Sequence, residues 1–321
     1  MKQLQDRFGR IHDYLRISLT GQCNMRCNYC VPHGDFAALK GGLEMKKEEI
    51  LSIAQVFVEW GIKKIRLTGG EPLLRKDFRE IALGLAQKNV ALAISTNGLL
   101  LHQYLDDLEK SGIQKVNISL DSLSAESFKN ITESGKLSTV LNNMELCLKR
   151  GMEVKINAVA LKGVNENELL KLASLTLDYP LSVRFIEFMP FFKNEWNLEK
   201  VFGLDEILLL LKKEFVLQKL KDGQHDTDKK YKIEGAKGNI GIISTITQPF
   251  CQGCNRLRLT ADGKIKNCLF GTTELDLLSA LRKGEDIAKI IQQSVAEKHQ
   301  KTGGQNLLLG SENRSMISIG G

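Results

Sequence analysis

Six strand-like segments alternate with helical ones over the first two-thirds of the chain. β-Branched and aliphatic runs predict strands over 14–20, 63–68, 91–96, 114–121, 153–161 and 181–188. Apolar residues at helical spacing predict helices over 46–60, 77–88, 101–110, 138–150 and 166–177. Consecutive strand–helix units favour a parallel sheet with helices outside, and right-handed crossovers curl such a sheet into a barrel. We therefore expect an α/β fold, an incomplete (β/α)6 TIM-like barrel, with functional residues at the carboxyl ends of its strands.

The pattern changes after the sixth predicted strand. An irregular aromatic stretch begins near residue 190, a helix is predicted over 204–213, and the polar segment 220–231 is typical of a hairpin or loop. The change in pattern places a domain boundary within 190–215. We expect a partial-barrel domain, 1–200, followed by a smaller domain, 201–321, with cysteines of its own.

The charge balance points to an anionic partner. The chain has 45 Lys and Arg against 38 Asp and Glu, a formal net charge of +7. Nucleic-acid binders carry basic runs with interleaved aromatics, whereas several arginines here stand singly inside predicted strands. We interpret Lys212, Lys213 and the lysines of 219–232 as solvated faces. An anionic small molecule is therefore favoured over nucleic acid.

The cysteines indicate metal ligation in a reducing compartment. No apolar run is long enough to span a bilayer, and the first ten residues contain no apolar signal segment, so we expect a cytoplasmic protein without a membrane partner. Seven cysteines cannot all pair, and cytosolic thiols stay reduced. Three lie within 23–30 and three within 251–268, which is typical of metal ligation. Cys147, alone in a helical segment, is expected to be a small core residue.

The first triad, Cys23, Cys27 and Cys30, forms a C-x3-C-x2-C loop after the first predicted strand. Iron–sulfur clusters prefer thiolate ligands, and three thiolates on a four-iron cluster leave one iron open to a further molecule. A structural zinc site with His33 as fourth ligand is the alternative. After the second strand, the run Gly-Gly-Glu-Pro at 69–72 is either a turn or a loop whose glycines let backbone approach a ligand closely.

The second triad, Cys251, Cys254 and Cys268, has the spacing C-x2-C-x13-C. A hairpin turn at Asp262-Gly263 would return the last cysteine toward the first two. A second cluster is favoured, and a zinc ribbon is the alternative. His299, in a polar helical stretch, is expected to be solvated.

Two arginines follow this C-x2-C pair in the run CNRLRL. Strand alternation puts Arg256 and Arg258 on one face beside the cysteines. There they either recognise phosphate with their planar donors or balance the negative charge of a cluster.

The first cysteine loop has an aromatic, Tyr29, before its last cysteine. With the Gly-Gly-Glu-Pro run, it resembles the radical S-adenosylmethionine superfamily. This resemblance implies a 4Fe–4S cluster on the first triad, whose open iron binds the amino and carboxylate groups of S-adenosylmethionine. It also implies one-electron cleavage that releases a 5′-deoxyadenosyl radical. The positions that match the superfamily's S-adenosylmethionine contacts are Tyr29, Gly69, Gly70, Glu71, Ser119 and Met189.

Three further motifs resemble the GTP 3′,8-cyclase family: GRIHDYLRISLT near the start, CNRLRLTADGK, and RSMISIGG at the end. This resemblance implies a second 4Fe–4S cluster on the second triad, whose open iron binds the guanine of GTP. The positions that match the family's GTP-binding residues are Arg16, Lys64, Arg66, Thr96, Lys155, Arg184, Arg256, Leu257 and Arg258. It further implies that the terminal Gly320 and Gly321 enter the active site and take part in the radical chemistry.

The activity implied by the family is the first step of molybdenum-cofactor biosynthesis. Hydrogen abstraction from ribose C3′ of GTP would precede attack on guanine C8 and reduction to 3′,8-cyclo-7,8-dihydro-GTP. The expected partners are an electron donor such as flavodoxin or ferredoxin, cyclic pyranopterin monophosphate synthase as recipient of the product, and a second copy of the chain in a homodimer.

Two other functions compete with this interpretation. A radical enzyme that modifies peptides could carry an auxiliary cluster, but such enzymes usually have more than three cysteines near the C-terminus. A two-cluster electron-transfer protein or a zinc-stabilised binding protein gives no reason for the Gly-Gly-Glu-Pro run or for basic residues along the strands.

Overall fold

The computed structural model describes residues 2–30, 44–310 and 313–320. Strands within these ranges form one sheet of twelve, in the order β12-β11-β10-β1-β2-β3-β4-β5-β6-β9-β8-β7. The strands are β1 (Tyr14–Ser18), β2 (Lys64–Thr68), β3 (Ala91–Thr96), β4 (Lys115–Ser119), β5 (Glu153–Ala160), β6 (Ser182–Glu187), β7 (Leu217–Lys219), β8 (Lys229–Ile233), β9 (Asn239–Ile243), β10 (Arg256–Leu259), β11 (Lys264–Lys266) and β12 (Leu275–Asp276).

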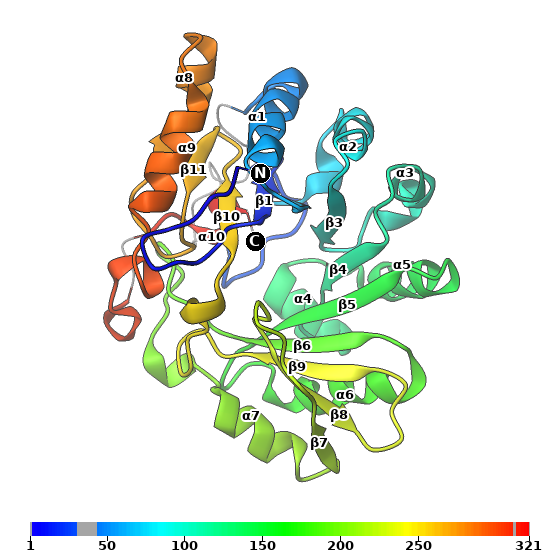
Figure 1. The fold of residues 1–321 in the computed structure, drawn as a ribbon. Coiled ribbons are helices and arrows are strands. Elements are labelled where there is room, and N and C mark those ends of the chain that lie inside the picture. Colours follow the sequence, from blue (N-terminus) through cyan, green and yellow to red (C-terminus); the bar gives the residue numbers. More distant parts are fainter. Residues whose placement is uncertain (1, 31–43, 311–312, 321) are drawn as a thin grey trace.

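Helices cover the outer side of the curved sheet, as Figure 1 shows for α1, α2, α3 and α5. No helix in the described ranges has the length and hydrophobicity needed to cross a lipid bilayer. The helices are α1 (Lys47–Glu59), α2 (Phe78–Ala86), α3 (Leu105–Lys110), α4 (Ala125–Thr132), α5 (Leu137–Lys149), α6 (Glu166–Asp178), α7 (Leu204–Leu211), α8 (Leu277–Arg282), α9 (Ile287–Ala296) and α10 (Met316–Ile319). Short 3-10 turns occupy Pro72–Leu74, Leu101–Gln103, Leu198–Lys200, Cys251–Gly253, Thr302–Gly304 and Leu307–Leu309.

The predicted incomplete barrel is confirmed. Strands β1 to β6 pair in parallel with their neighbours, and each predicted helix is present within a few residues of its expected bounds. The polar segment after α7, expected to be a hairpin or a loop, is a hairpin that connects the antiparallel strands β7 and β8. Helix α4 was not predicted because its buried apolar stripe has only Phe128 and Ile131 as large residues.

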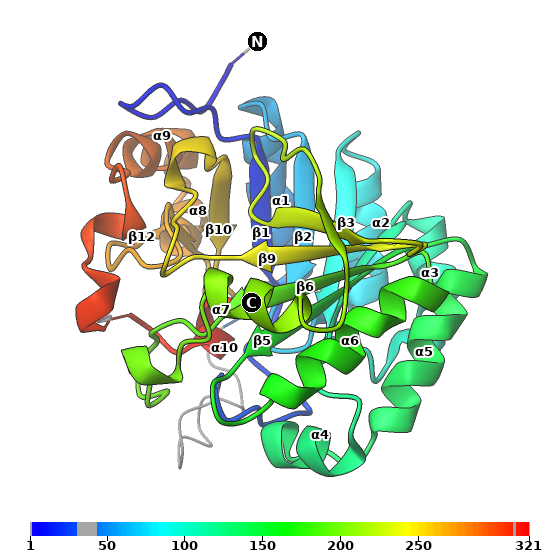
Figure 2. The same ribbon diagram turned by 90° about the horizontal axis from the view of Figure 1, so that it is seen from below.

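The chain beyond residue 200 extends both edges of this sheet. Strand β10 pairs in parallel with β1, and β9 pairs in parallel with β6. Figure 2 shows α8 and α9 near β10 on one side of the molecule, and α5 and α6 on the opposite side. Buried Leu257 and Ile265 share one hydrophobic core with Leu15 and Ile17. The domain division at 200 stays a prediction, although the core crosses it.

The side chains of β1 alternate between the two faces of the sheet: apolar ones point outward to the helices, and polar ones point to the inner side. Leu15 and Ile17 are fully buried with Ile50 and Ile53 of α1 in the outer core. The alternate residues of β1, Tyr14 and Arg16, line a cavity on the inner side. The inner face of this sheet is therefore available for polar chemistry.

A buried carboxylate attaches the segment after β6 to the end of that strand. Glu187 accepts hydrogen bonds from the backbone N–H groups of Leu204 at 3.1 Å, Ile246 at 2.7 Å and Thr247 at 3.0 Å. The Thr247 hydroxyl donates to it as well. Four donors thus converge on one fully buried side chain.

Replacing Glu187 by Gln should lower the free energy of unfolding by about 2–3 kcal/mol, because one acceptor becomes an NH2 group that faces other donors. Denaturant unfolding of the iron-free protein measures this change. The control is Glu199→Gln, an exposed site nearby, which should leave stability within about 0.5 kcal/mol. Equal stability of both variants would show that these hydrogen bonds do not hold the segment.

Candidate active site

One cavity of about 310 Å³ joins the inner face of the sheet to the second cysteine triad. Three thiols, two carboxylates and eight cationic side chains line it. These are Cys251, Cys254 and Cys268; Asp226 and Asp228; and Arg16, Lys64, Arg66, Lys155, Arg184, Lys230, Arg256 and Arg258. The excess of positive charge indicates an anionic ligand.

Strand register places three arginines level with one another. Arg16 pairs with Arg258 on one side and with Arg66 on the other. Burial and the neighbouring arginine charges hold the pKa of Arg16 well below its ordinary value. Burial, together with Arg256, lowers the pKa of Arg258 to about 10. The fold therefore concentrates like charges that a bound anion would relieve.

Tyr14 belongs to the same inner face, and sequence reasoning missed it. Arg66 Nε donates to its hydroxyl at 2.7 Å, and the Lys64 ammonium lies 4.7 Å from its ring centre. Burial acts to raise the pKa of Tyr14, but the charges of Arg66, Arg16 and Lys64 lower it to about 7. Its position two residues before Arg16 on the same strand was the available signal.

Several polar atoms in the cavity have no hydrogen-bond partner among the described residues. They are Nε and Nη2 of Arg184 and the side-chain oxygens of Asn117 and Asn157. Buried polar groups are normally paired, so these atoms indicate where a ligand would bind. The two asparagines were not among the predicted site residues.

Three predictions near this cavity had different outcomes. The interpretation of Lys230 as part of a solvated face is wrong, because it is half-buried, bonds Asp226 at 2.6 Å and lines the cavity. Thr96 lies apart from the lining and donates its hydroxyl to Glu71 at 2.8 Å. The side chain of Leu257 belongs to the outer core. Roles of Thr96 and Leu257 in binding GTP stay predictions.

The second triad lies at the amino end of β10. Cys254 Sγ is 3.8 Å from Arg256 Nη2 and 3.7 Å from Lys298 Nζ. Burial opposes ionisation, but these two cations lower the pKa of Cys254 to about 6. Thr302 N–H donates to Cys251 Sγ at 3.5 Å. Burial raises the pKa of Cys251, so it is at Cys254 that the environment favours thiolate, the form that ligates iron.

The N-terminal motif supports this triad. Arg10, held by Asp6 at 2.6 Å, donates to the carbonyl oxygens of Cys251 at 2.9 Å, His299 at 2.8 Å and Gln300 at 2.9 Å. His299 is exposed, as expected.

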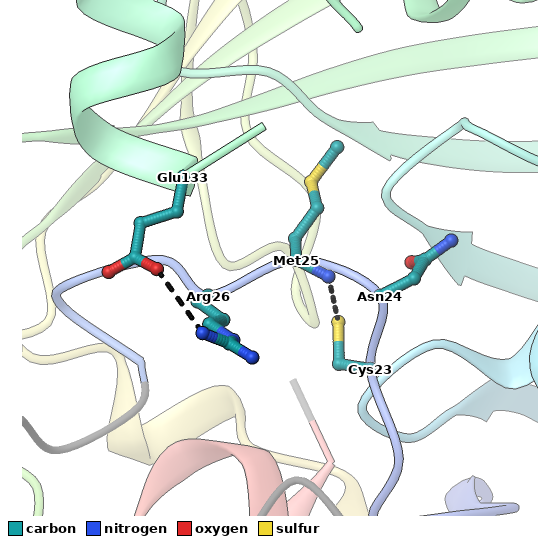
Figure 3. A pocket seen from close by; sticks show the side chains of 5 residues that line it. All are labelled: Cys23, Asn24, Met25, Arg26 and Glu133. Atoms are coloured by element: carbon teal, nitrogen blue, oxygen red, sulfur yellow. Dashed lines mark hydrogen bonds and ion pairs between the residues drawn. The ribbon is translucent and has the colours of Figure 1, made fainter. Parts of the chain in front are cut away.

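The first triad lies on the loop after the carboxyl end of β1. A cavity of about 260 Å³ lies beside this loop, and of the three cysteines only Cys23 lines it. Figure 3 shows this cavity, where Arg26 lies 3.8 Å from Glu133 and Met25 N–H donates to Cys23 Sγ at 3.5 Å. Backbone bonds from Arg26 N to Thr132 O and Asn28 N to Ile131 O, both 3.0 Å, hold the loop against the end of α4.

The three thiols of this loop influence one another. Desolvation by surrounding protein raises the pKa of Cys23 to about 11 and that of Cys30 to about 12, although both side chains keep some solvent contact. Desolvation, Asp121 and the two other thiols raise the pKa of Cys27 as well. A group that lowers the charge of bound thiolates, such as an iron cluster, fits this donor set.

The Gly-Gly-Glu loop packs directly on the cysteine loop. Gly70 N–H donates to Thr20 O at 2.8 Å, and Glu71 N–H donates to Gln22 O at 2.7 Å. A Cβ on Gly70 would lie 2.3 Å from Gln22 O, so only glycine fits this contact. The backbone N–H group of Gly70 thus bonds the chain itself.

The Glu71 carboxylate is also occupied internally. It accepts from Leu73 N at 3.1 Å, Thr96 Oγ1 at 2.8 Å and Asn97 N at 2.7 Å. Complete burial raises its pKa to about 7. In the structure, the Glu71 side chain joins the segments that follow β2 and end β3, beneath the cysteine loop.

The remaining predicted S-adenosylmethionine contacts lie in different surroundings, and their role stays a prediction. Tyr29 donates its hydroxyl to Asp121 at 2.8 Å, Ser119 is exposed at the end of β4, and Met189 lines the basic cavity. No three His, Cys, Asp or Glu side chains of the described residues are arranged to hold a single metal ion. His33, the alternative zinc ligand, lies outside the described residues. Cys147 is fully buried, as expected.

The described part of the C-terminal segment, α10 and Gly320, lies on the inner side of the sheet near β1 and β10 (Figure 1). Arg258 Nη1 donates to Gly320 O at 2.7 Å. A Cβ on Gly320 would lie 2.8 Å from both Ser18 Cβ and Thr68 Oγ1, so a glycine is needed at this buried point. Gly321 lies outside the described residues.

Comparison with known proteins assigns a class first. The Radical SAM superfamily profile matches residues 17–176, and the Molybdenum Cofactor Synthesis C profile matches 181–303. The fold resembles Streptococcus suis SuiB bound to S-adenosylmethionine, with a TM-score of 0.64, 13% identity, and coverage of 88% of this chain and 66% of that one. The chain is a radical S-adenosylmethionine protein, a class that uses a 4Fe–4S cluster and S-adenosylmethionine.

Relatives then identify the family. GTP 3′,8-cyclase of Peptoclostridium acidaminophilum is 40% identical, over 99% of this chain and 98% of that protein. The mitochondrial GTP 3′,8-cyclase of Arabidopsis thaliana is 41% identical, over 99% and 83%. Human molybdenum cofactor biosynthesis protein 1 is 41% identical, but this chain spans only about half of its length, 51%. The chain belongs to the GTP 3′,8-cyclase family.

Gly70→Ala should disrupt the first site while leaving the barrel folded, because the added Cβ meets backbone that cannot move aside. We expect loss of the iron held by the first triad and loss of S-adenosylmethionine binding. Iron analysis after anaerobic reconstitution, calorimetry and circular dichroism measure these effects. Gly135→Ala, where a Cβ would meet nothing within 4 Å, is the control. Normal iron and binding in the Gly70 variant would contradict this packing.

Proposed function

We infer that this chain catalyses the S-adenosylmethionine-dependent cyclisation of GTP to 3′,8-cyclo-7,8-dihydro-GTP, the first step of molybdenum-cofactor biosynthesis. One observation carries the inference: a single cavity brings seven predicted GTP-binding cations together with the second cysteine triad. The names of relatives that match nearly end to end support the same activity.

The first triad would hold the 4Fe–4S cluster, and Tyr29, Ser119, Met189 and the Gly69-Gly70 backbone would border S-adenosylmethionine. When bound, these groups supply a carbon radical that removes a hydrogen atom from the substrate. Glu71 would act by fixing the loop on which the cysteines rest, since its oxygens are already hydrogen-bonded.

The cations would hold the triphosphate. Guanidinium groups bind phosphate oxygens through paired planar donors, and Arg184 has two nitrogens without a partner among the described residues. Arg16, Arg66 and Arg258 stand level on neighbouring strands, so a phosphate between them would relieve their mutual repulsion.

The second triad would hold a second 4Fe–4S cluster. Its thiols line the same cavity as the arginines, and the cations beside Cys254 favour its thiolate. Three thiolates leave one iron open, where the N1–C2 edge of guanine could bind. That edge is where GTP and ATP differ, so this site would select the base.

In the reaction the ribose C3′–H bond breaks, a C3′–C8 bond forms, and one electron and one proton complete the product, an isomer of GTP. The Gly320-Gly321 tail would take part after substrate has bound, since Gly320 already lies against Ser18 and Thr68 inside the sheet.

We further propose a cytoplasmic homodimer, reduced by flavodoxin or ferredoxin, that passes its product to cyclic pyranopterin monophosphate synthase.

Product analysis tests this function. The anaerobically reconstituted protein is incubated with GTP, S-adenosylmethionine and dithionite, and nucleotides are separated and examined by mass and NMR spectroscopy. We expect a species with the mass of GTP that lacks the aromatic C8 proton, together with 5′-deoxyadenosine. Formation of 5′-deoxyadenosine with unchanged GTP would overturn the assignment and favour another substrate.

Arg256→Ala and Arg258→Ala should each weaken GTP binding by about 1.5–3 kcal/mol, the scale of hydrogen bonds to charged groups. S-adenosylmethionine affinity should change little, because the first triad lies on the loop after the other end of β1. Calorimetry with each ligand measures both effects. Arg79→Ala, an outer arginine paired with Asp107, is the control. Loss of both ligands together would mean that the substitution had unfolded the site.

A chain ending at Ile319 should bind GTP and retain iron but form no cyclised product. The tail is too short to stabilise a core, and lost turnover with retained binding marks a group that acts after substrate binds. Product formation at saturating GTP and GTP affinity measure the two properties. The control is Leu309→Ala, a highly exposed site in the same C-terminal segment. Full activity of the truncated chain would remove the tail from the mechanism.

A further inference from the structure

Lys298 is a buried lysine whose ammonium lies among the groups of the second cysteine triad. Lys298 is only 2% exposed and lies two positions beyond the end of α9. Its Nζ donates to Arg256 O at 2.9 Å and to Asn267 O, and lies 3.7 Å from Cys254 Sγ. Since Asn267 directly precedes Cys268, one ammonium joins the two segments that carry Cys254 and Cys268.

The charge of this lysine has few local partners. Burial lowers the pKa of Lys298, and the positive charges of Arg256 and Arg10 lower it further. The groups that favour the charged form are the sulfurs of Cys254 and Cys268. A buried ammonium is costly unless an anion faces it, and a thiolate-bound cluster would be such an anion.

A second buried lysine nearby shows the contrast. Lys266 is 1% exposed, but it donates to Gly271 O at 2.6 Å and pairs with the Glu274 carboxylate at 3.1 Å. It also donates to Asn313 Oδ1 at 3.2 Å. The ammonium of Lys266 is therefore paired with the Glu274 carboxylate, whereas the ammonium of Lys298 faces the Cys254 sulfur.

We propose that Lys298 is a positioning residue for the second cluster. Its ammonium donates a hydrogen bond to the Cys254 sulfur and thereby raises the reduction potential of the cluster. The proposal rests on the proposed second 4Fe–4S cluster at Cys251, Cys254 and Cys268. Reduction adds negative charge to a cluster, so a cation and a hydrogen bond at its sulfur stabilise the reduced state. The same ammonium keeps the two cysteine segments at a fixed separation.

The test uses a parent protein that carries only the second site. Replacing Cys23, Cys27 and Cys30 by Ala removes the first cluster, and the full chain is then reconstituted anaerobically. The reduction potential of the remaining cluster is titrated by electron paramagnetic resonance. In this background Lys298→Gln keeps amide donors but removes the charge, so the potential should shift to more negative values. Lys266→Gln is the matched control, and its potential should equal that of the parent.

Each outcome decides a different claim. A parent without iron and sulfide at the second site would overturn the proposed second cluster itself. Iron present, with the same potential in Lys298→Gln as in the parent, would overturn the role of Lys298 alone. An equal shift in Lys266→Gln would overturn it too, because the effect would then be a general one of burial. Loss of iron from Lys298→Gln, with unchanged circular dichroism and melting temperature, would support the positioning role.

A further variant covers the case in which Lys298→Gln does not fold. Lys298→Arg keeps the positive charge and the donor groups. A potential close to that of the parent would support the proposal. A potential shifted to more negative values despite the retained charge would overturn it.

Discussion

The parallel pairing of β10 with β1 is the constraint on which the site depends. It joins segments about 240 residues apart in the chain and sets Arg258 beside Arg16, which is itself beside Arg66. Neighbouring strands lie about 4.8 Å apart, so these guanidiniums repel one another where little water can screen them. Leu15, Ile17, Leu257 and Leu259 on the opposite face stabilise the pairing by apolar burial. The sheet thus holds together a cationic surface whose internal repulsion a bound anion would reduce.

The same pairing fixes where the two cysteine triads lie. Cys254 precedes β10 and lies near the amino end of β1, where Tyr14 N–H donates to Asn255 O at 3.2 Å. Cys23 follows the carboxyl end of β1. Five residues of strand separate these ends, about 17 Å at roughly 3.3 Å per residue. A nucleotide along the strands could therefore reach from one triad toward the other, past the cations and the glycine tail.

Much of this arrangement could be predicted from the sequence, because it depends on local patterns. Strand and helix periods identified the barrel, and cysteine spacing identified both triads. Cys23 and the Gly-Gly-Glu loop do follow the carboxyl ends of β1 and β2, where functional residues were expected, but Lys64 begins β2 at its amino end. The extension of the sheet by β9 and β10, and the burial of Lys298, depend on distant pairings that no local pattern records. The occupied carboxylate of Glu71 has the same cause, since its donors come from β3 and the loop after it.

The central claim is that the first triad and the basic cavity serve one substrate. Deuterium transfer tests it most directly, with GTP labelled at C3′ and incubated with the reconstituted protein, S-adenosylmethionine and reductant. The account predicts one deuterium in the 5′-deoxyadenosine that is released, because the hydrogen atom leaves ribose C3′ inside this cavity. Unlabelled 5′-deoxyadenosine, with deuterium retained in the nucleotide, would contradict it.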